Sequence, residues 1–133
     1  MHWNILIVDD SKALRAMVRR VLSLTGLEIG EVHEAGTGQL ALDMLRRLPI
    51  DIVLTDLNMP GMSGNELLEQ IHSTSALSPI RVIVMTSEHA QPKLAALAQL
   101  GVRTCLIKPF SPEALRDALL ALTGPAAGEL HGR

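Results

Sequence analysis

Short apolar runs, each leading into a polar residue, recur four times along this chain of 133 residues. They span residues 5–8, 52–55, 82–85 and 105–107, and they are followed by Asp9-Asp10, Asp56, Thr86 and Lys108. Runs of this length that are rich in β-branched residues indicate strands buried on both faces, as in parallel sheets. Because such sheets place their sites at the carboxyl ends of the strands, the polar positions are predicted to converge at one edge.

Apolar residues at intervals of three and four separate these runs and predict helices. Ser11 is the expected N-cap of the first helix, which Gly26 ends, and Ser111 followed by Pro112 starts the last helix. Further helices are predicted over residues 39–48, 64–73 and 93–100. In the helix over 39–48, the residues expected to face inward are Leu40, Ala41, Met44, Leu45 and Leu48. A short, partly polar stretch at 32–35 is predicted to be an edge strand.

Strands and helices in strict alternation predict the fold class. Five such pairs imply an α/β protein with right-handed crossovers, a parallel sheet and helices on both of its faces. We expect the flavodoxin-like (βα)5 arrangement, a doubly wound five-stranded sheet of order 2-1-3-4-5. The expected domain covers residues 1–123, and the Gly- and Ala-containing stretch at 124–133 is expected to be a loose tail.

Composition excludes several classes of protein. Twelve basic and fourteen acidic residues give a formal net charge of -2, and aromatic residues make up only 2% of the chain, which argues against direct binding of nucleic acid. The single cysteine, Cys105, excludes an internal disulfide and a cysteine-based zinc site. The apolar runs are far shorter than a membrane span, and the first residues do not resemble a signal peptide. We therefore expect a cytoplasmic protein without membrane contact.

Three carboxylates are predicted to share the crevice between the first and third strands. Asp9, Asp10 and Asp56 would repel one another there, which calls for a counter-charge. A divalent cation with oxygen ligands meets this need, and Mg²⁺ is the expected cofactor. Lys108 adds an ammonium group and Thr86 a hydroxyl. A carboxylate beside Mg²⁺ and a lysine is suited to phosphoryl transfer, in which positioning and charge neutralisation do most of the work.

Four motifs in this order resemble a known family. They are Asp-Asp-Ser at 9–11, Thr-Asp-Leu-Asn-Met-Pro-Gly-Met-Ser-Gly at 55–64, Met-Thr-Ser at 85–87 and Lys-Pro-Phe at 108–110. Together they resemble the receiver domain of response regulators, of the single-domain chemotaxis (CheY-like) type, over about residues 4 to 122. The resemblance implies a phosphoacceptor in the histidine-aspartate phosphorelay of a two-component system, with chemotaxis as the candidate pathway.

The resemblance also implies roles for the acidic residues. Asp56 would accept the phosphoryl group from a phosphohistidine on a sensor histidine kinase or phosphotransfer protein. Asp10 and Asp56 would hold Mg²⁺ directly, together with the backbone carbonyl of Asn58, and Asp9 would act through water. Such a domain is a switch rather than an enzyme, because it catalyses only its own phosphorylation and dephosphorylation.

Further positions carry implied roles in the switch. Thr86 would hydrogen-bond the phosphoryl group, Lys108 would pair with its oxygens, and the bond between Lys108 and Pro109 would be cis. Asn58 and Glu88 stand where the family tunes the rate of acyl phosphate hydrolysis. Phosphorylation would then alter a protein-binding surface for a downstream target that the sequence does not name.

One position departs from the family. Three residues before the lysine, receivers usually carry Tyr or Phe, whose ring moves when the threonine does, but this chain has Cys105. Its only Phe is Phe110, and it has no Tyr. The phosphorylation chemistry is unaffected, but no aromatic ring stands at this position to couple to the threonine.

Other classes of protein fit less well. An aspartate-nucleophile phosphohydrolase would carry an Asp-x-Asp pair and a cap segment, whereas this chain has adjacent aspartates and no room for a cap. A flavin or nucleotide module would carry a phosphate loop after the first strand, where this chain has Asp9-Asp10-Ser11. A pseudo-receiver would lack an acceptor-site residue, and all five are present. Taken singly, Asp56 or Thr86 could be a helix cap, and Asn58 a turn residue. Output is expected through protein contact, unless the chain is a piece of a longer regulator.

Overall fold

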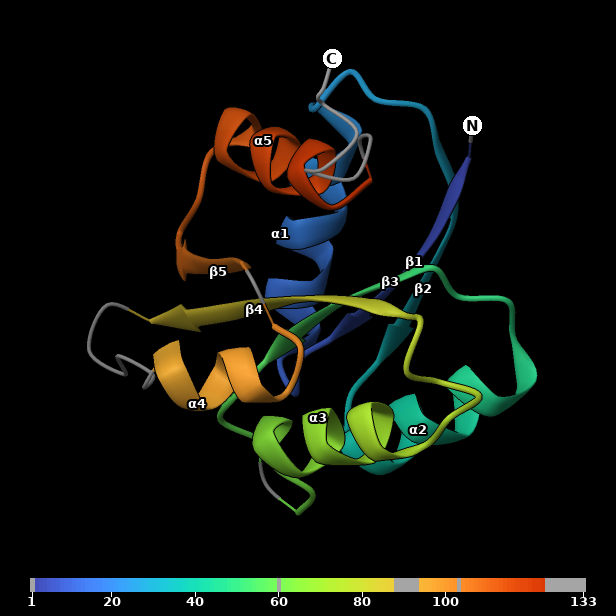
Figure 1. The fold of residues 1–133 in the computed structure, drawn as a ribbon. Coiled ribbons are helices and arrows are strands. Elements are labelled where there is room, and N and C mark those ends of the chain that lie inside the picture. The colour runs from blue at the N-terminus through green and yellow to red at the C-terminus, as the bar shows by residue number, and fades with distance from the viewer. Residues whose placement is uncertain (1, 60, 88–93, 103, 124–133) are drawn as a thin grey trace.

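The computed structural model describes residues 2–59, 61–87, 94–102 and 104–123. Within them, strands and helices alternate along the chain (Figure 1). The strands are β1 (Trp3–Val8), β2 (Ile29–Ala35), β3 (Ile52–Asp56), β4 (Arg81–Ser87) and β5 (Thr104–Lys108). The helices are α1 (Lys12–Ser23), α2 (Gly38–Arg47), α3 (Gly64–Ser73), α4 (Leu94–Gln99) and α5 (Pro112–Thr123).

All neighbouring strands pair in parallel, and the sheet order is β2-β1-β3-β4-β5. The predicted fold class and strand order are therefore confirmed. The order reverses between β1 and β3, where Val8 is aligned with Thr55. The carboxyl ends of these two strands thus lie side by side, at the point where open α/β sheets form their ligand crevices.

Helices cover both faces of the sheet, with α1 and α5 on one side and α2, α3 and α4 on the other (Figure 1). Alternate residues of β1 follow this division, since Ile5 and Ile7 pack with α1 and α5 while Leu6 and Val8 pack with α2 and α3. Because β3 lies in the middle of the sheet, all five of its residues are buried. Burial on both faces explains why the strand sequences are continuously apolar rather than alternating.

Side-chain caps start the helices that lead away from the site. Ser11 accepts a hydrogen bond from the Leu14 N–H at 3.2 Å, and Ser111 accepts one from the Ala114 N–H at 3.0 Å, so both predicted caps are confirmed. Ser63 forms a capping box with Glu66 at the start of α3. Each cap satisfies backbone N–H groups that the first helical turn leaves without partners.

The inward face of α2 differs from the prediction at two positions. Leu40 is 44% exposed, whereas Leu42, which was not assigned to the core, is only 3% exposed. The helix starts at Gly38, and its buried stripe runs through Ala41, Leu42 and Leu45 at helical spacing. Leu40 lies two residues, or about 200°, from Leu42 around the helix axis, so it faces solvent.

Several boundaries also shift. The strand predicted at 32–35 extends over the whole of β2, and it is an edge strand as expected. Helix α4 covers Leu94–Gln99, whereas the predicted helix over 93–100 began at a position outside the described residues. The tail predicted at 124–133 also lies outside them. None of the helices in the described ranges has the length and apolar character needed to cross a membrane.

Candidate functional site

Three carboxylates meet at the carboxyl ends of β1 and β3. One oxygen from each of Asp9, Asp10 and Asp56 lies within 4.8 Å of the others. Asp9 and Asp10 directly follow β1 and Asp56 ends β3, so the alignment of these two strands brings them together. Asp9 and Asp56 are buried and Asp10 is exposed. The cluster therefore has a buried floor and an open side.

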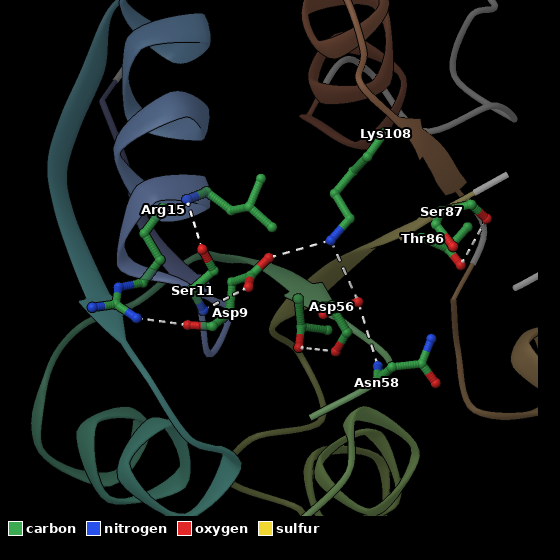
Figure 2. A network of polar contacts seen from close by, with 10 residues as sticks. Asp9, Ser11, Arg15, Asp56, Asn58, Thr86, Ser87 and Lys108 are labelled. Carbon is green, nitrogen blue, oxygen red and sulfur yellow. Dashed lines mark hydrogen bonds and ion pairs between the residues drawn. The ribbon is translucent and has the colours of Figure 1, made fainter. Parts of the chain in front are cut away.

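The side chain of Lys108 reaches into this cluster from the end of β5 (Figure 2). Its Nζ atom lies 3.3 Å from Oδ2 of Asp9 and 3.6 Å from Oδ1 of Asp56. Only 14% of the lysine side chain is exposed, which limits screening by water. The peptide bond between Lys108 and Pro109 is cis. One ammonium group thus partly offsets two buried carboxylates.

The environment of Asp56 disfavours its ionised form. Burial raises the pKa of this carboxyl above its usual value, and the nearby Asp9 carboxylate acts in the same direction. The Lys108 ammonium and the N–H of Asn58, which donates to Oδ1 at 3.3 Å, oppose the shift without cancelling it. A bound divalent cation would supply the missing positive charge and favour the carboxylate.

The loop between β3 and α3 begins directly after Asp56. Asn58 is exposed on this loop, and the buried side chains of Leu57 and Met59 on either side anchor it. At the start of α3, the Gly64 N–H donates to the Leu57 carbonyl at 3.0 Å, and a Cβ at Gly64 would overlap the Asp56 carbonyl oxygen. Only glycine allows the helix to approach the strand so closely.

Thr86 lies on β4 at the same edge of the sheet (Figure 2). Asp56 is aligned with Met85, so the threonine follows one residue further along the neighbouring strand. Its side chain is buried, and its hydroxyl donates to the Ser87 carbonyl at 3.4 Å. Glu88, which is predicted to tune the rate of acyl phosphate hydrolysis, lies outside the described residues.

Cys105 occupies β5, where it is aligned with Val84 of β4. It is half-buried and packs against the core that α2, α3 and α4 share. Burial raises the pKa of its thiol above the usual value. A thiol with this environment is a small packing group rather than an activated nucleophile.

Sequence reasoning missed Arg15, which lies on α1. Its Nη1 donates to the backbone carbonyl of Asp9 at 2.7 Å (Figure 2). No motif includes this arginine, and its contact depends on how α1 crosses the sheet. The only local signal is its place four residues after the N-cap Ser11, one helical turn from the start of α1.

The donors in this cluster suit a hard divalent cation. Each of the three acidic side chains offers a carboxylate oxygen, and the exposed loop at Asn58 can add a backbone carbonyl. Oxygen ligands with an open side for water and a phosphoryl group match the preferences of Mg²⁺. The residues present therefore fit the metal that the sequence predicted.

Fold and site together define a flavodoxin-like α/β domain with a cluster of three carboxylates and a lysine at its switch point. The family model for the response regulator receiver domain matches residues 5–120. The chemotaxis protein CheY-3 of Vibrio cholerae is 37% identical over 118 residues, which is 89% of each chain. The structure of Vibrio cholerae CheY4 matches with a TM-score of 0.78 and 30% identity, covering 92% of this chain and 99% of that one.

This chain belongs to the response regulator receiver domain family, and it is a response regulator of the two-component type. A further relative is the nitrate/nitrite response regulator NarP of Escherichia coli, which is 38% identical over 90% of this chain but only 54% of its own length. Chemotaxis proteins and a larger regulator therefore both resemble this domain at similar levels of identity.

Proposed function

We propose that Asp56 is the phosphoryl acceptor of a Mg²⁺-dependent signalling switch. The observation that carries this assignment is its position: a buried carboxylate within 4.8 Å of two others, with the Lys108 ammonium 3.6 Å away. A phosphoryl group on Asp56 can be neutralised on one side by a cation and on the other by Lys108. This environment stabilises the negative charge that builds up during phosphoryl transfer.

The reaction forms one bond and breaks one. A carboxylate oxygen of Asp56 attacks the phosphorus of a phosphohistidine, an oxygen–phosphorus bond forms, the phosphorus–nitrogen bond breaks, and the imidazole leaves. Bound Mg²⁺, held by Asp10, Asp56 and the Asn58 carbonyl with Asp9 acting through water, would neutralise the phosphoryl oxygens. Lys108 pairs with one of these oxygens, and the Thr86 hydroxyl donates to another.

The phosphodonor that fits this chemistry is a sensor histidine kinase or a phosphotransfer protein. The domain acts on no separate substrate, so it works as a switch that catalyses only its own phosphorylation and hydrolysis. Asn58 and Glu88 are the positions that set the lifetime of the acyl phosphate. Chemotaxis is the pathway that we favour, on the strength of the similarity to CheY-3 along 89% of both chains.

The output is a change in a protein-binding surface rather than in a nucleic-acid or membrane contact. The surface that we assign to it consists of α4, β5 and α5. Since Cys105 stands at the usual aromatic position, the signal from Thr86 passes by a smaller change in packing than the movement of a ring. We place the switch in the cytoplasm, where kinases of this type present their phosphohistidine.

Labelling by acetyl phosphate tests the acceptor. We expect Asp56→Asn to abolish Mg²⁺-dependent labelling while its circular dichroism spectrum stays that of the folded protein. Asp43→Asn is a matched control, because Asp43 is an exposed aspartate on α2, away from the crevice. Labelling of Asp56→Asn at the level of the control would refute the assignment.

A further inference from the structure

Arg15 connects α1 to the backbone of the acidic cluster. We propose that Arg15 is a positioning residue for metal binding, because it holds the carbonyl of Asp9 and so sets where the Asp10 carboxylate lies. This inference rests on the proposed Mg²⁺ site and goes beyond it by adding a residue that touches neither metal nor phosphoryl group. Groups that orient metal ligands from behind commonly affect affinity as strongly as some ligands do.

The guanidinium is held in place from two sides. Its Nη1 donates to the Asp9 carbonyl at 2.7 Å, and its Nε donates to Oε1 of Glu34 on β2 at 3.0 Å. The second oxygen of Glu34 accepts from Nε of Arg19 at 2.9 Å, and Arg19 also donates to the Val32 carbonyl at 3.1 Å. Only 16% of the Arg15 side chain is exposed. The arginine is therefore a rigid link between α1, the edge strand and the turn after β1.

Every polar group of Asp9 has a partner in this arrangement. Its N–H donates to the Ala35 carbonyl, Oδ1 accepts from the Ser11 N–H, Oδ2 accepts from Lys108, and the carbonyl accepts from Arg15. The carbonyl belongs to the peptide unit that joins Asp9 to Asp10, and this unit is planar. Holding the carbonyl oxygen therefore fixes the orientation of this peptide plane, and with it the position of the Asp10 backbone nitrogen. Asp10 is exposed, so its carboxylate depends on this backbone anchor more than the buried Asp9 does.

Glu34 balances the positive charge of Arg15, so that the arginine does not repel a bound cation. Burial raises the pKa of Glu34, but hydrogen bonds and charge from Arg19 and Arg15 outweigh it, so the pKa of this carboxyl is lowered overall. Glu34 therefore stays ionised at neutral pH and balances the charge of Arg15. The arginine supplies a strong hydrogen-bond donor close to the metal ligands without adding an unbalanced positive charge.

The lack of a side chain at Gly36 leaves room for the guanidinium of Arg15. A Cβ at this position would lie 3.2 Å from Nη1 of Arg15 and 3.9 Å from its Cζ. Gly36→Ala would therefore displace the guanidinium by a few tenths of an ångström while leaving every charge in the chain unchanged. This substitution therefore tests the position of the Arg15 donor without changing its charge.

Calorimetric titration of the full chain with Mg²⁺ alone tests the proposal. We expect Arg15→Ala to weaken Mg²⁺ binding about tenfold. Arg19→Ala is the matched control, because it removes the other guanidinium from the same glutamate without touching Asp9, and it should change the affinity less than about twofold. In labelling by acetyl phosphate, Arg15→Ala should need about tenfold more Mg²⁺ for half-maximal rate, yet reach a maximal rate close to that of the wild type.

The outcomes separate this inference from the proposed function. If the wild type binds Mg²⁺ and Arg15→Ala binds it equally well, or if Arg19→Ala weakens binding as much as Arg15→Ala, the positioning role is refuted and the proposed function stands. If the wild type binds no Mg²⁺, both are refuted. Should Arg15→Ala fail to fold, Gly36→Ala takes its place, and unchanged Mg²⁺ affinity in that variant would refute the positioning role.

Discussion

The ammonium nitrogen of Lys108 lies 3.3 Å from a carboxylate oxygen of Asp9, although 99 residues separate them in the chain. Their strands, β5 and β1, are not neighbours, since β3 and β4 lie between them. The lysine side chain therefore crosses the carboxyl edge of the sheet and passes Asp56 on the way. This contact joins residues from the two halves of the doubly wound sheet at the proposed site of phosphorylation.

Removal of the lysine should separate phosphoryl transfer from metal binding. We expect Lys108→Ala to lower the rate of labelling by acetyl phosphate by roughly 10²-fold, because a charged donor to the phosphoryl oxygens is lost. Mg²⁺ affinity should be kept or increased, since a competing cation leaves the carboxylates. Calorimetry and labelling on the same preparation measure both effects. A parallel loss of Mg²⁺ affinity would contradict the proposed division of roles.

The raised pKa of Asp56 predicts a pH-dependent stability of the metal-free protein. A carboxyl whose pKa is higher in the folded state holds its proton more tightly there, so its stabilising effect is complete below the usual value of 3.8 and is lost as the pH rises through the folded value. Asp56→Asn should therefore melt above the wild type at neutral pH, by roughly 4 °C for a change of about 1 kcal/mol.

Thermal unfolding with a chelator present, from pH 3 to pH 8, measures this difference. The two melting temperatures should converge as the pH falls toward the acid end, where Asp56 is protonated in both the folded and unfolded states. A variant that melts below the wild type at neutral pH would show that the Lys108 pairing outweighs the cost of burial.

Two leucines on α2 should differ sharply in their contribution to stability. Leu42→Ala leaves a cavity in the core beneath α2 and is expected to lower the free energy of unfolding by about 2–5 kcal/mol. Leu40→Ala removes the same atoms from a side chain that is 44% exposed and should cost less than about 1 kcal/mol. Urea denaturation of both variants measures the difference, and equal losses would contradict the observed orientation of the helix.

The thiol of Cys105 offers a probe of the proposed output surface. Because burial raises its pKa, alkylation by iodoacetamide at neutral pH should be slower than for a free thiol, and faster at higher pH. Adding Mg²⁺ and beryllofluoride, which mimics the phosphoryl group, should change this rate if β5 belongs to the surface that switches. Equal rates in both forms would argue against that surface.

Much of the site could be predicted from linear patterns, because strands and caps depend on near neighbours. An apolar run that ends in aspartate predicts a buried strand with a polar residue at its end, which is how Asp9 and Asp56 were found. Alternation of strands and helices then restricts the topology to a few choices, of which the observed order is one. The helix starts at Ser11 and Ser111 followed from the same local logic, since a cap involves only the next three residues.

Contacts that depend on the angle between layers were decided by the tertiary structure alone. Spacing correctly assigned Ala41 and Leu45 of α2 to the core, but it included the exposed Leu40 and omitted the buried Leu42, because it did not resolve the edge of the buried stripe. It gave no sign that Arg15 reaches the Asp9 carbonyl, because that depends on where α1 crosses β1 and β2. The sequence by itself determined which polar residues lie near the carboxyl ends of the strands, since hydrogen bonding and burial are periodic along the chain. Only packing in three dimensions decided their distances, their charge balance and the raised pKa of Asp56, because these depend on groups far apart in the chain.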